Sequence, residues 1–328
     1  MDAPFLSHDE LQSAARLVHA VLPPTPQYRW PLLEALIAPR PDDGTELWVK
    51  HENHTPVGAF KIRGGLVYFE RLLASGAKPA GVVSATRGNH GQSIGFAARR
   101  HGIPALIVVP RGNSREKNAA MRALGVELIE HGDDFQAARE HAQGLAAERG
   151  WLMVPSFHRD LVAGVASYAL ELFGGAPALD TVYVPIGLGS GASGLIAARD
   201  ALGLSTEIVG VVSDGAPAYA LSLARGEPVS HAVTTTLADG MACRTPEPEA
   251  LAILQKGLAR VVLVSDAQVA EAMRRLYECT HQVAEGAGAA ALAAALVERA
   301  QLAGRRTAIV LSGGNIDREV YADVLAGA

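Results

Sequence analysis

The chain has 328 residues, of which 49% are hydrophobic and 19% charged, and its formal net charge at pH 7 is −5. This length and composition are typical of a globular protein with two domains and exclude an intrinsically disordered chain. The negative net charge, with Lys and Arg scattered along the sequence, excludes the basic surface that binds nucleic acids.

Short runs of aliphatic residues alternate with helical patterns, which is typical of a parallel sheet covered by helices. Strands are predicted at 81–85, 105–109, 127–130, 181–186, 207–212, 261–264 and 307–311, and helices at 92–101, 114–124, 135–148, 267–279 and 287–300. Ser265 is predicted to cap the helix at 267–279, and turns are predicted at 39–44 and 174–177. We therefore expect an α/β fold with mostly parallel sheets.

The segment KHENHTPVGAFKIRGG, residues 50–65, contains the first candidate catalytic group. Lys61 follows Phe60 and Gly58 and is surrounded by apolar residues. An apolar pocket lowers the pKa of a lysine, so that its neutral amine can attack an aldehyde. The alternative is a lysine at the start of a helix whose ammonium group reaches water.

Two further segments lie where a strand is predicted to lead into a helix. The first is SATRGNHGQ (84–92), in which glycines allow a ligand to approach the backbone and Asn89 and His90 supply donors; a capped turn is the alternative. The second is PIGLGSGASG (185–194), a glycine-rich turn typical of a phosphate site. A dinucleotide site is its alternative, but that motif normally opens its domain near the first strand.

The segment LSGGNID (311–317) ends the last predicted strand. Ser312 is a small hydroxyl at the carboxyl end of that strand, where α/β folds bind ligands. The two glycines that follow allow close approach to a flat ring. Taken alone, the segment favours a simple turn, and only together with the other segments does it indicate a ligand site.

Together these four segments resemble the fold type II pyridoxal-phosphate enzymes, the group of threonine and serine dehydratases, serine racemase and the cysteine synthases. The resemblance extends from about residue 47 to 317. Within that group, GAFKIRGG, GNHGQ, TLADGMA (236–242) and SGGNID are similar to the threonine dehydratase branch.

The resemblance implies a role for each residue of these motifs. Lys61 would bind pyridoxal 5'-phosphate as a Schiff base, Phe60 would lie against its ring, Asn89 would bond to its phenolic oxygen, and Ser312 would face its pyridine nitrogen. The phosphate would be wrapped by Gly187, Leu188, Gly189, Ser190 and Gly191, and the substrate would be bound by Thr86, Arg87, Gly88 and His90.

The resemblance also implies an architecture and a reaction. Residues 1–71 and 158–328 would form a large cofactor-binding domain, and residues 72–157 a small domain that closes over the substrate. The chain would be a homodimer. It would convert a small hydroxy-amino acid to a 2-keto acid and ammonia through an aminoacrylate, with Lys61 as the base that removes the α-proton.

Several positions depart from the commonest pattern of the family. Ala59 replaces a serine, and Leu188 and Ser190 interrupt a run of glycines, although backbone donors remain. Val212 and Ala218 stand where metal-dependent relatives have carboxylates, so no metal is expected. The chain ends soon after the last motif, so we expect no allosteric domain.

Arg87 replaces the hydroxyl that transfers the second proton in serine racemase, so we expect negligible racemisation. Two interpretations of Arg87 remain open at this point. Its guanidinium could pair with a surface carboxylate, or it could bind an anionic group of the substrate.

The alternatives to this function are a β-replacing synthase, an amino-acid racemase, a protein that binds pyridoxal phosphate without turnover, and a nicotinamide-dependent oxidoreductase. The N-terminus carries acidic residues and no long apolar core, so we expect neither a signal peptide nor a membrane segment. The two cysteines, Cys243 and Cys279, are too few for a disulfide framework, which favours the cytoplasm.

Overall fold

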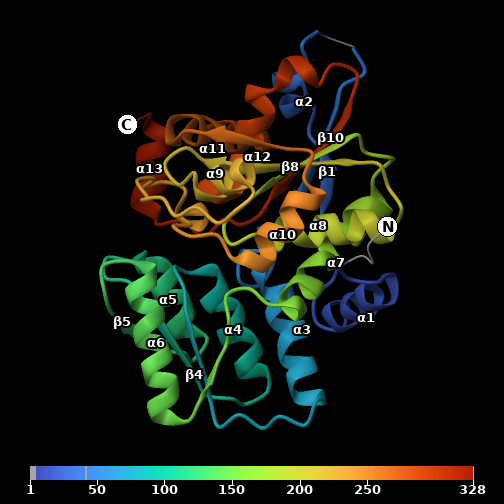
Figure 1. Ribbon diagram of the computed structural model, residues 1–328. Helices are drawn as coiled ribbons and strands as arrows, with labels where there is room; N and C mark the ends of the chain where they lie inside the picture. The colour runs from blue at the N-terminus through green and yellow to red at the C-terminus, as the bar shows by residue number, and fades with distance from the viewer. Residues whose placement is uncertain (1–4, 41–42, 328) are drawn as a thin grey trace.

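The computed structural model describes residues 5–40 and 43–327 and has an α/β fold built on two separate sheets (Figure 1). The larger sheet has six strands and lies in the upper half of Figure 1, and the smaller sheet has four and lies in the lower half. The predicted α/β class is confirmed. The predicted turn at 39–44 falls partly outside the described residues.

The six-stranded sheet is parallel except at one edge. Its strands, in spatial order, are β1 (Gln27–Arg29), β2 (Glu46–His51), β10 (Arg306–Leu311), β7 (Thr181–Pro185), β8 (Glu207–Ser213) and β9 (Arg260–Val264). Only β1 runs antiparallel to its neighbour. The last strand of the chain, β10, therefore lies between β2 and β7, and their carboxyl ends meet at one edge.

Both faces of this sheet are covered by helices. In β10, Ala308 and Val310 pack into one core, while Ile309 and Leu311 pack into the other, because successive side chains of a strand point to opposite faces. The first core includes residues of α1 (His8–His19), α3 (Lys61–Ala74), α7 (Arg159–Gly175), α8 (Ser190–Ala201), α9 (Ala218–Arg225) and α10 (Pro248–Gly257). The second includes residues of α2 (Pro31–Ile37), α11 (Asp266–Thr280), α12 (Gly286–Val297) and α13 (Arg318–Ala326).

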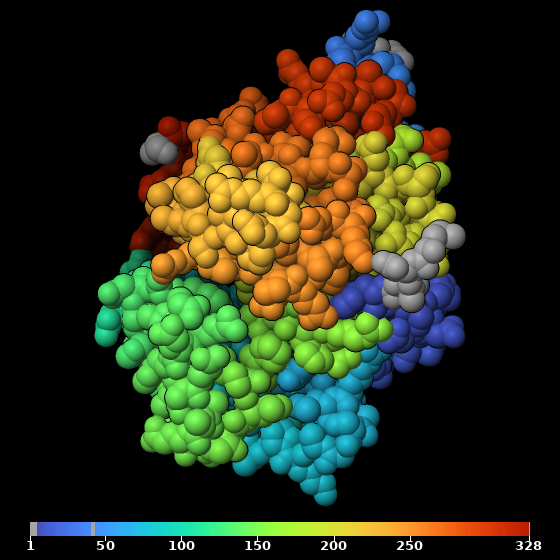
Figure 2. Space-filling view, in the orientation of Figure 1, coloured from blue at the N-terminus to red at the C-terminus, as the bar shows by residue number. Residues whose placement is uncertain are grey.

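The four-stranded sheet is entirely parallel. Its order is β5 (Glu127–Glu130), β4 (Ala105–Val109), β3 (Val82–Ala85) and β6 (Leu152–Met153). One face packs against α4 (Asn89–Arg100) and α5 (Arg115–Ala123), and the other against α6 (Phe135–Arg149). On the face shown in Figure 2, the green surface around residues 130–150 meets the orange surface around residues 240–260, where Arg244 lies 3.3 Å from Asp134.

All seven predicted strands and all five predicted helices are present, with shifts at some ends. Ser265 caps α11 through a capping box, as predicted. The turn predicted at 174–177 is partly wrong, because α7 continues to Gly175. The alanine-rich segment at 287–300 forms α12 followed by a short 3-10 helix, η2 (Arg299–Gln301). Among the residues that the structure describes, none of the helices combines the length and the apolar character needed to span a bilayer.

Candidate active site

The residues singled out in the sequence lie at the edge where parallel strands end. Ser312 follows β10, residues 187–189 follow β7, and residues 86–88 follow β3 of the smaller sheet. Lys61 is the first residue of α3, after the loop that leaves β2. The carboxyl ends of such strands are where α/β folds bind ligands. The four motifs therefore belong to one candidate site.

Backbone contacts fix Lys61 beside Ser312. The Phe60 amide donates to the Ser312 carbonyl at 3.1 Å, and Ala59 forms an isolated antiparallel bridge with Gly313. The loop before α3 is thereby attached to the end of β10. Lys61 is the next residue. Its backbone is therefore held by β10, a strand about 250 residues further along the chain.

The Lys61 amine is held inside the site. Its Nζ donates to Ser190 Oγ at 2.7 Å and lies 4.9 Å from the centre of the Phe60 ring. Lys61 is half-buried as a residue, and burial of the amine lowers its pKa to about 8. The alternative of an ammonium group that reaches water does not agree with this position.

A small cavity adjoins the amine. It is lined by Lys61, Gly64, His90, Ser156, Leu161, Val165 and Ser190. His90 is buried, and burial, followed by the nearby charge of Lys61, lowers its pKa to about 3. Its Nε2 has no hydrogen-bond partner among the described atoms. The His90 ring is therefore neutral near pH 7 and has a free polar atom for a ligand.

The glycine loop, residues 187–191, leads directly into α8. Gly189 is the N-cap residue with φ +94°, a left-handed conformation that favours glycine. A Cβ on Gly187 would lie 2.3 Å from the Gly240 carbonyl oxygen, so no side chain fits there. The first N–H groups of α8 have no acceptor within the helix. This arrangement forms an anion site at a helix N-terminus.

Two tyrosines hold the carbonyl groups of the same loop. Tyr219 donates to the Leu188 carbonyl and Tyr168 to the Gly191 carbonyl, each at 3.0 Å. These contacts fix the loop without using its N–H donors. The helix begins at Ser190, so Gly191 of the glycine-rich segment belongs to its first turn.

Asn89 is tied to two residues of the larger-sheet half of the molecule. Its Nδ2 donates to Glu285 Oε1 at 2.6 Å, and its Oδ1 accepts from Asn315 Nδ2 at 2.9 Å. In the same loop, the Gly88 amide donates to Thr86 Oγ1 at 2.9 Å. The loop that carries Asn89 is therefore ordered by its own contacts and by contacts across the two sheets.

Ser312 lies at the floor of the site with only 4% of its surface exposed. Its Oγ is 3.4 Å from the Ala287 carbonyl oxygen at the start of α12, which is a long hydrogen bond. Because this hydrogen bond is weak, the Ser312 hydroxyl can form a hydrogen bond to a ligand instead at little cost in energy. It carries no charge, unlike a carboxylate at the same place.

Arg87 carries the permanent positive charge of the loop before α4. It is half-buried, and its Nε is buried without a hydrogen-bond partner. Within 5–40 and 43–327, no carboxylate lies within 4.0 Å of its guanidinium. The interpretation in which Arg87 pairs with a surface carboxylate is therefore wrong for the described residues.

Four residues near the site were not identified from the sequence. They are Lys117, Asp239, Glu285 and Ser156. Asp239 lies within the TLADGMA segment, so its motif was recognised without its role. Lys117 and Glu285 belong to no quoted motif, and a charged residue in a helix or at its end usually lies in water.

The positions expected to lack metal ligands are both apolar and buried. Val212 lies on β8 and Ala218 begins α9, and neither supplies an oxygen. In the part of the chain that the structure describes, no group of three or more His, Cys, Asp or Glu side chains could hold a metal ion.

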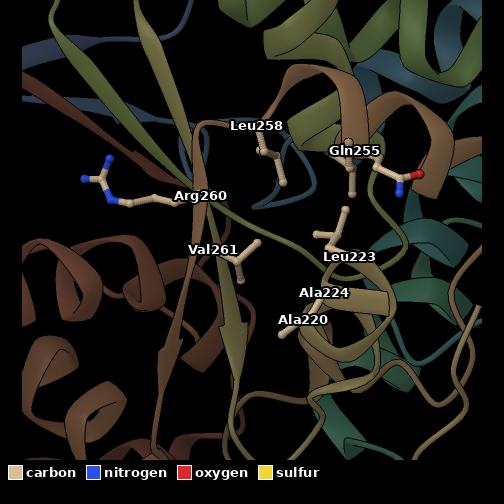
Figure 3. A pocket seen from close by; sticks show the side chains of 8 residues that line it. Ala220, Leu223, Ala224, Gln255, Leu258, Arg260 and Val261 are labelled. Carbon is tan, nitrogen blue, oxygen red and sulfur yellow. The ribbon is translucent and has the colours of Figure 1, made fainter. Parts of the chain in front are cut away.

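A second hollow lies on the surface between α9, α10 and β9 (Figure 3). It is lined by Ala220, Leu223, Ala224, Leu254, Gln255, Leu258, Arg260 and Val261. Its one charged group, Arg260, is paired with Glu298 at 2.7 Å and Glu207 at 3.2 Å. The hollow is otherwise nearly apolar and carries no group suited to catalysis.

Comparisons with known proteins show the family of this chain. A family model described as "Pyridoxal-phosphate dependent enzyme" matches residues 23–313. The chain is 36% identical over 275 residues to the L-threonine ammonia-lyase of Thermotoga maritima, covering 84% of this chain and 68% of that protein. It is 31% identical over 285 residues to the L-threo-3-hydroxyaspartate ammonia-lyase of Saccharomyces cerevisiae, covering 87% of each. The crystal structure of a pyridoxal 5'-phosphate-dependent aspartate racemase matches with a TM-score of 0.90 at 27% identity, covering 97% of this chain and 98% of that one.

Proposed function

The chain belongs to the family of pyridoxal-phosphate-dependent enzymes and is an ammonia-lyase of that family, and we propose that it converts a small β-hydroxy-α-amino acid to a 2-keto acid and ammonia. The observation that carries this proposal is the buried amine of Lys61 beside a glycine loop at a helix N-terminus. A buried neutral amine can bind an aldehyde, and a glycine loop at a helix N-terminus can bind a phosphate. Pyridoxal phosphate has both groups.

The residues of the site fit this cofactor. Lys61 would hold its aldehyde carbon, Phe60 would lie along its ring, and Ser312 would face its pyridine nitrogen. The loop N–H groups would bind its phosphate, because they lie at the N-terminus of α8, where the first N–H groups have no acceptor within the helix. When bound, the cofactor supplies an electron sink for the pair of electrons left by the α-proton.

Lys61 would perform the proton transfer. When it is not holding the cofactor, its Nζ is an amine with a pKa of about 8, close to the pH at which it must work. It would accept the α-proton of the substrate. The β-hydroxyl would then leave together with that proton as water, and hydrolysis of the resulting enamine by one water would give the 2-keto acid and ammonia.

Two other residues would set the conditions for elimination. Ser312 offers a neutral hydroxyl to the pyridine nitrogen, so no carboxylate favours its protonation. The neutral ring of His90, with its free Nε2, would donate to or accept from the substrate without adding a charge. We further propose that the segment 72–157 moves as a domain that covers the substrate and excludes water.

The experiment that tests this proposal is a substrate screen with two products measured. Purified protein is supplied with L-threonine, L-serine, phenylserine or threo-3-hydroxyaspartate, and the keto acid and ammonia released are both measured. We expect the two products in equal amounts. The Lys61→Ala variant is the control for non-enzymatic release. If the cofactor is bound but no keto acid forms from any of these, the lyase proposal fails. Turnover that requires an added thiol would favour a β-replacing synthase.

A second candidate substrate class is favoured by Arg87. A buried guanidinium N–H without a partner costs about 1–3 kcal/mol, and an anionic ligand would satisfy it. The yeast relative is named for hydroxyaspartate, which has a second carboxylate. This candidate predicts that hydroxyaspartate is the better substrate of the screen.

The Arg87→Ala variant separates the two classes. If Arg87 binds the second carboxylate, its loss should lower kcat/KM for hydroxyaspartate roughly 10- to 100-fold and leave threonine nearly unchanged. An equal loss for both substrates would assign Arg87 to the carboxylate that all amino acids share. No loss for either would remove Arg87 from the substrate site.

A further inference from the structure

A buried charged cluster lies behind Asn89. Lys117 of α5 places its Nζ 2.6 Å from Asp239 Oδ2 and 3.0 Å from Glu285 Oε2. Asp239 lies in the short 3-10 helix η1 (Asp239–Met241), and Glu285 is the residue before α12. Lys117 is 4% exposed and Glu285 is 1% exposed. The cluster therefore joins a helix of the smaller sheet to two elements of the larger one, with Lys117 and Glu285 buried and the Asp239 side chain 27% exposed.

The three charges depend on one another. Burial alone would lower the pKa of Lys117, but the carboxylates of Glu285 and Asp239 outweigh it and raise that pKa, so the ammonium persists. Burial raises the pKa of Glu285, and Lys117 is the largest influence that opposes the rise. A buried carboxylate without its cation either takes up a proton or remains as a costly lone charge. Glu285 therefore stays ionised only while the Lys117 ammonium is beside it.

Asn89 is oriented by this carboxylate. Its Oδ1 accepts from Asn315 and one of its N–H groups is taken by Glu285. Asn315 also donates to the Val57 carbonyl at 2.7 Å, so its amide cannot be reversed without loss of that bond. If the Asn89 amide were reversed, its N–H groups would face the N–H groups of Asn315 and its oxygen would face the Glu285 carboxylate, and both contacts would be repulsive. The second N–H of Asn89 is therefore presented in one fixed direction, as a donor.

Gly88 allows Lys117 to reach the cluster. A Cβ on Gly88 would lie 2.5 Å from Lys117 Cδ, so the lysine stem passes over the backbone directly before Asn89. The same loop thus carries the amide and accommodates the cation that supports it. Lys117 is not among the residues that line the small cavity beside Lys61.

We propose that Lys117 is a positioning residue for Asn89: it keeps Glu285 ionised as an acceptor, and Glu285 holds the free N–H of Asn89 toward the cofactor. This rests on the proposed function, because it assumes that Asn89 donates to an oxygen of pyridoxal phosphate. Lys117 acts at a distance, through two hydrogen-bonded residues. Loss of Lys117 would therefore act on cofactor binding before it acts on the substrate.

The test is equilibrium dialysis of the holoenzyme against known concentrations of pyridoxal phosphate. Lys117→Met removes the charge and keeps the length of the side chain, and we expect it to weaken cofactor binding about tenfold or more. Adding Glu285→Gln to Lys117→Met removes the lone carboxylate and keeps an acceptor for Asn89, and we expect most of the affinity to return. A purely structural role for Lys117 predicts no such rescue.

A double-mutant cycle tests the path through Asn89. In an Asn89→Ala background, Lys117→Met should change cofactor affinity by less than about threefold. The matched control is Arg122→Met, which removes a cation from the same helix whose ion-pair partner, Glu130 at 3.7 Å, lies outside the cluster. We expect it to leave cofactor affinity unchanged. An equal effect of Lys117→Met with and without Asn89, or no effect at all, would overturn the proposal.

A second pair of variants serves if Lys117→Met does not fold. Glu285→Gln keeps an acceptor for Asn89 and Glu285→Leu does not, so the first should bind the cofactor nearly as the wild type does and the second about tenfold more weakly. Equal affinities would refute the positioning role. Wild-type protein that binds the cofactor and yields no keto acid would refute the proposed reaction alone, since cofactor affinity is measured without substrate.

Discussion

The pKa of the Lys61 amine can be measured in the protein without its cofactor. Burial lowers this pKa to about 8, whereas an ordinary lysine has a pKa of about 10.4. At pH 7 the neutral fraction of Lys61 is then about 9%, against about 0.04% for an ordinary lysine, a difference of roughly 200-fold. Since only the neutral amine attacks an aldehyde, the rate of reaction should rise with pH and level off above about pH 9.

The assay is reductive methylation with formaldehyde, which has no ionisable group of its own in this range. Labelling of the peptide that contains Lys61 is followed by mass spectrometry from about pH 6 to pH 10.5. Lys78, which is exposed, lies in the same digest and is the internal control. The shapes of the two pH profiles are compared, and not the absolute rates, because partial burial slows the labelling of Lys61 at every pH. A Lys61 rate that still rises tenfold per pH unit between about pH 9 and pH 10 would refute the lowered pKa.

The same shift has a consequence for stability. The unfolded chain binds a proton at this lysine more tightly than the folded protein does. The free energy of unfolding should therefore rise with pH, through this group, between about pH 8 and about pH 10.4. The Lys61→Met variant should lose that part of the dependence.

Three further predictions concern the same site. Lys61→Ala should abolish both the visible absorbance of the bound cofactor and lyase activity, measured by spectroscopy and keto-acid release, because one amine anchors the cofactor and accepts the proton. Gly187→Ala should abolish or sharply weaken cofactor binding in a titration, while Gly191→Ala keeps the fold, because a Cβ would lie 2.3 Å from a backbone oxygen in the first and 3.6 Å from its nearest neighbour in the second. Activity should survive dialysis against EDTA, because Val212 and Ala218 offer no oxygen ligand; a loss that added Mg²⁺ restores would contradict this.

The parts of the fold that could be predicted are those in which local sequence and tertiary structure agree. The strand at 307–311 is an unbroken aliphatic run, and it lies at the centre of the larger sheet, buried on both faces. The helix at 267–279 has a capping box and an amphipathic pattern, and it was found almost to the residue. Helix α7 was missed because most of its residues are buried, so that it lacks the polar face that marks a surface helix.

The site could be predicted where backbone geometry requires particular residues. The glycines of the loop at 187–191 are needed for a left-handed φ and a close backbone contact, and such requirements are visible in a sequence. The partners of Asn89 could not be found this way. Lys117 and Glu285 are 168 positions apart in the sequence, and only the tertiary fold brings their side chains to 3.0 Å from each other.

The balance of charge distinguishes the two buried ionic clusters near Lys61. On the far side of α3, Arg63 pairs with Glu52 (2.7 Å) and Glu171 (2.6 Å), and Lys50 pairs with Glu171 (2.6 Å). Two cations there face two carboxylates, so the cluster can be buried with little net charge and can hold the helix that carries Lys61.

The cluster beside Asn89 has one cation, Lys117, for two carboxylates. The Asp239 side chain is 27% exposed and is partly hydrated, whereas Glu285 is buried, so its negative charge is costly without donors around it. This charge is tolerable where a further donor is present, and the Asn89 amide is that donor for Glu285. The Arg63 cluster therefore helps to fix the position of the Lys61 amine, and the Lys117 cluster helps to fix the orientation of the Asn89 amide at the same site.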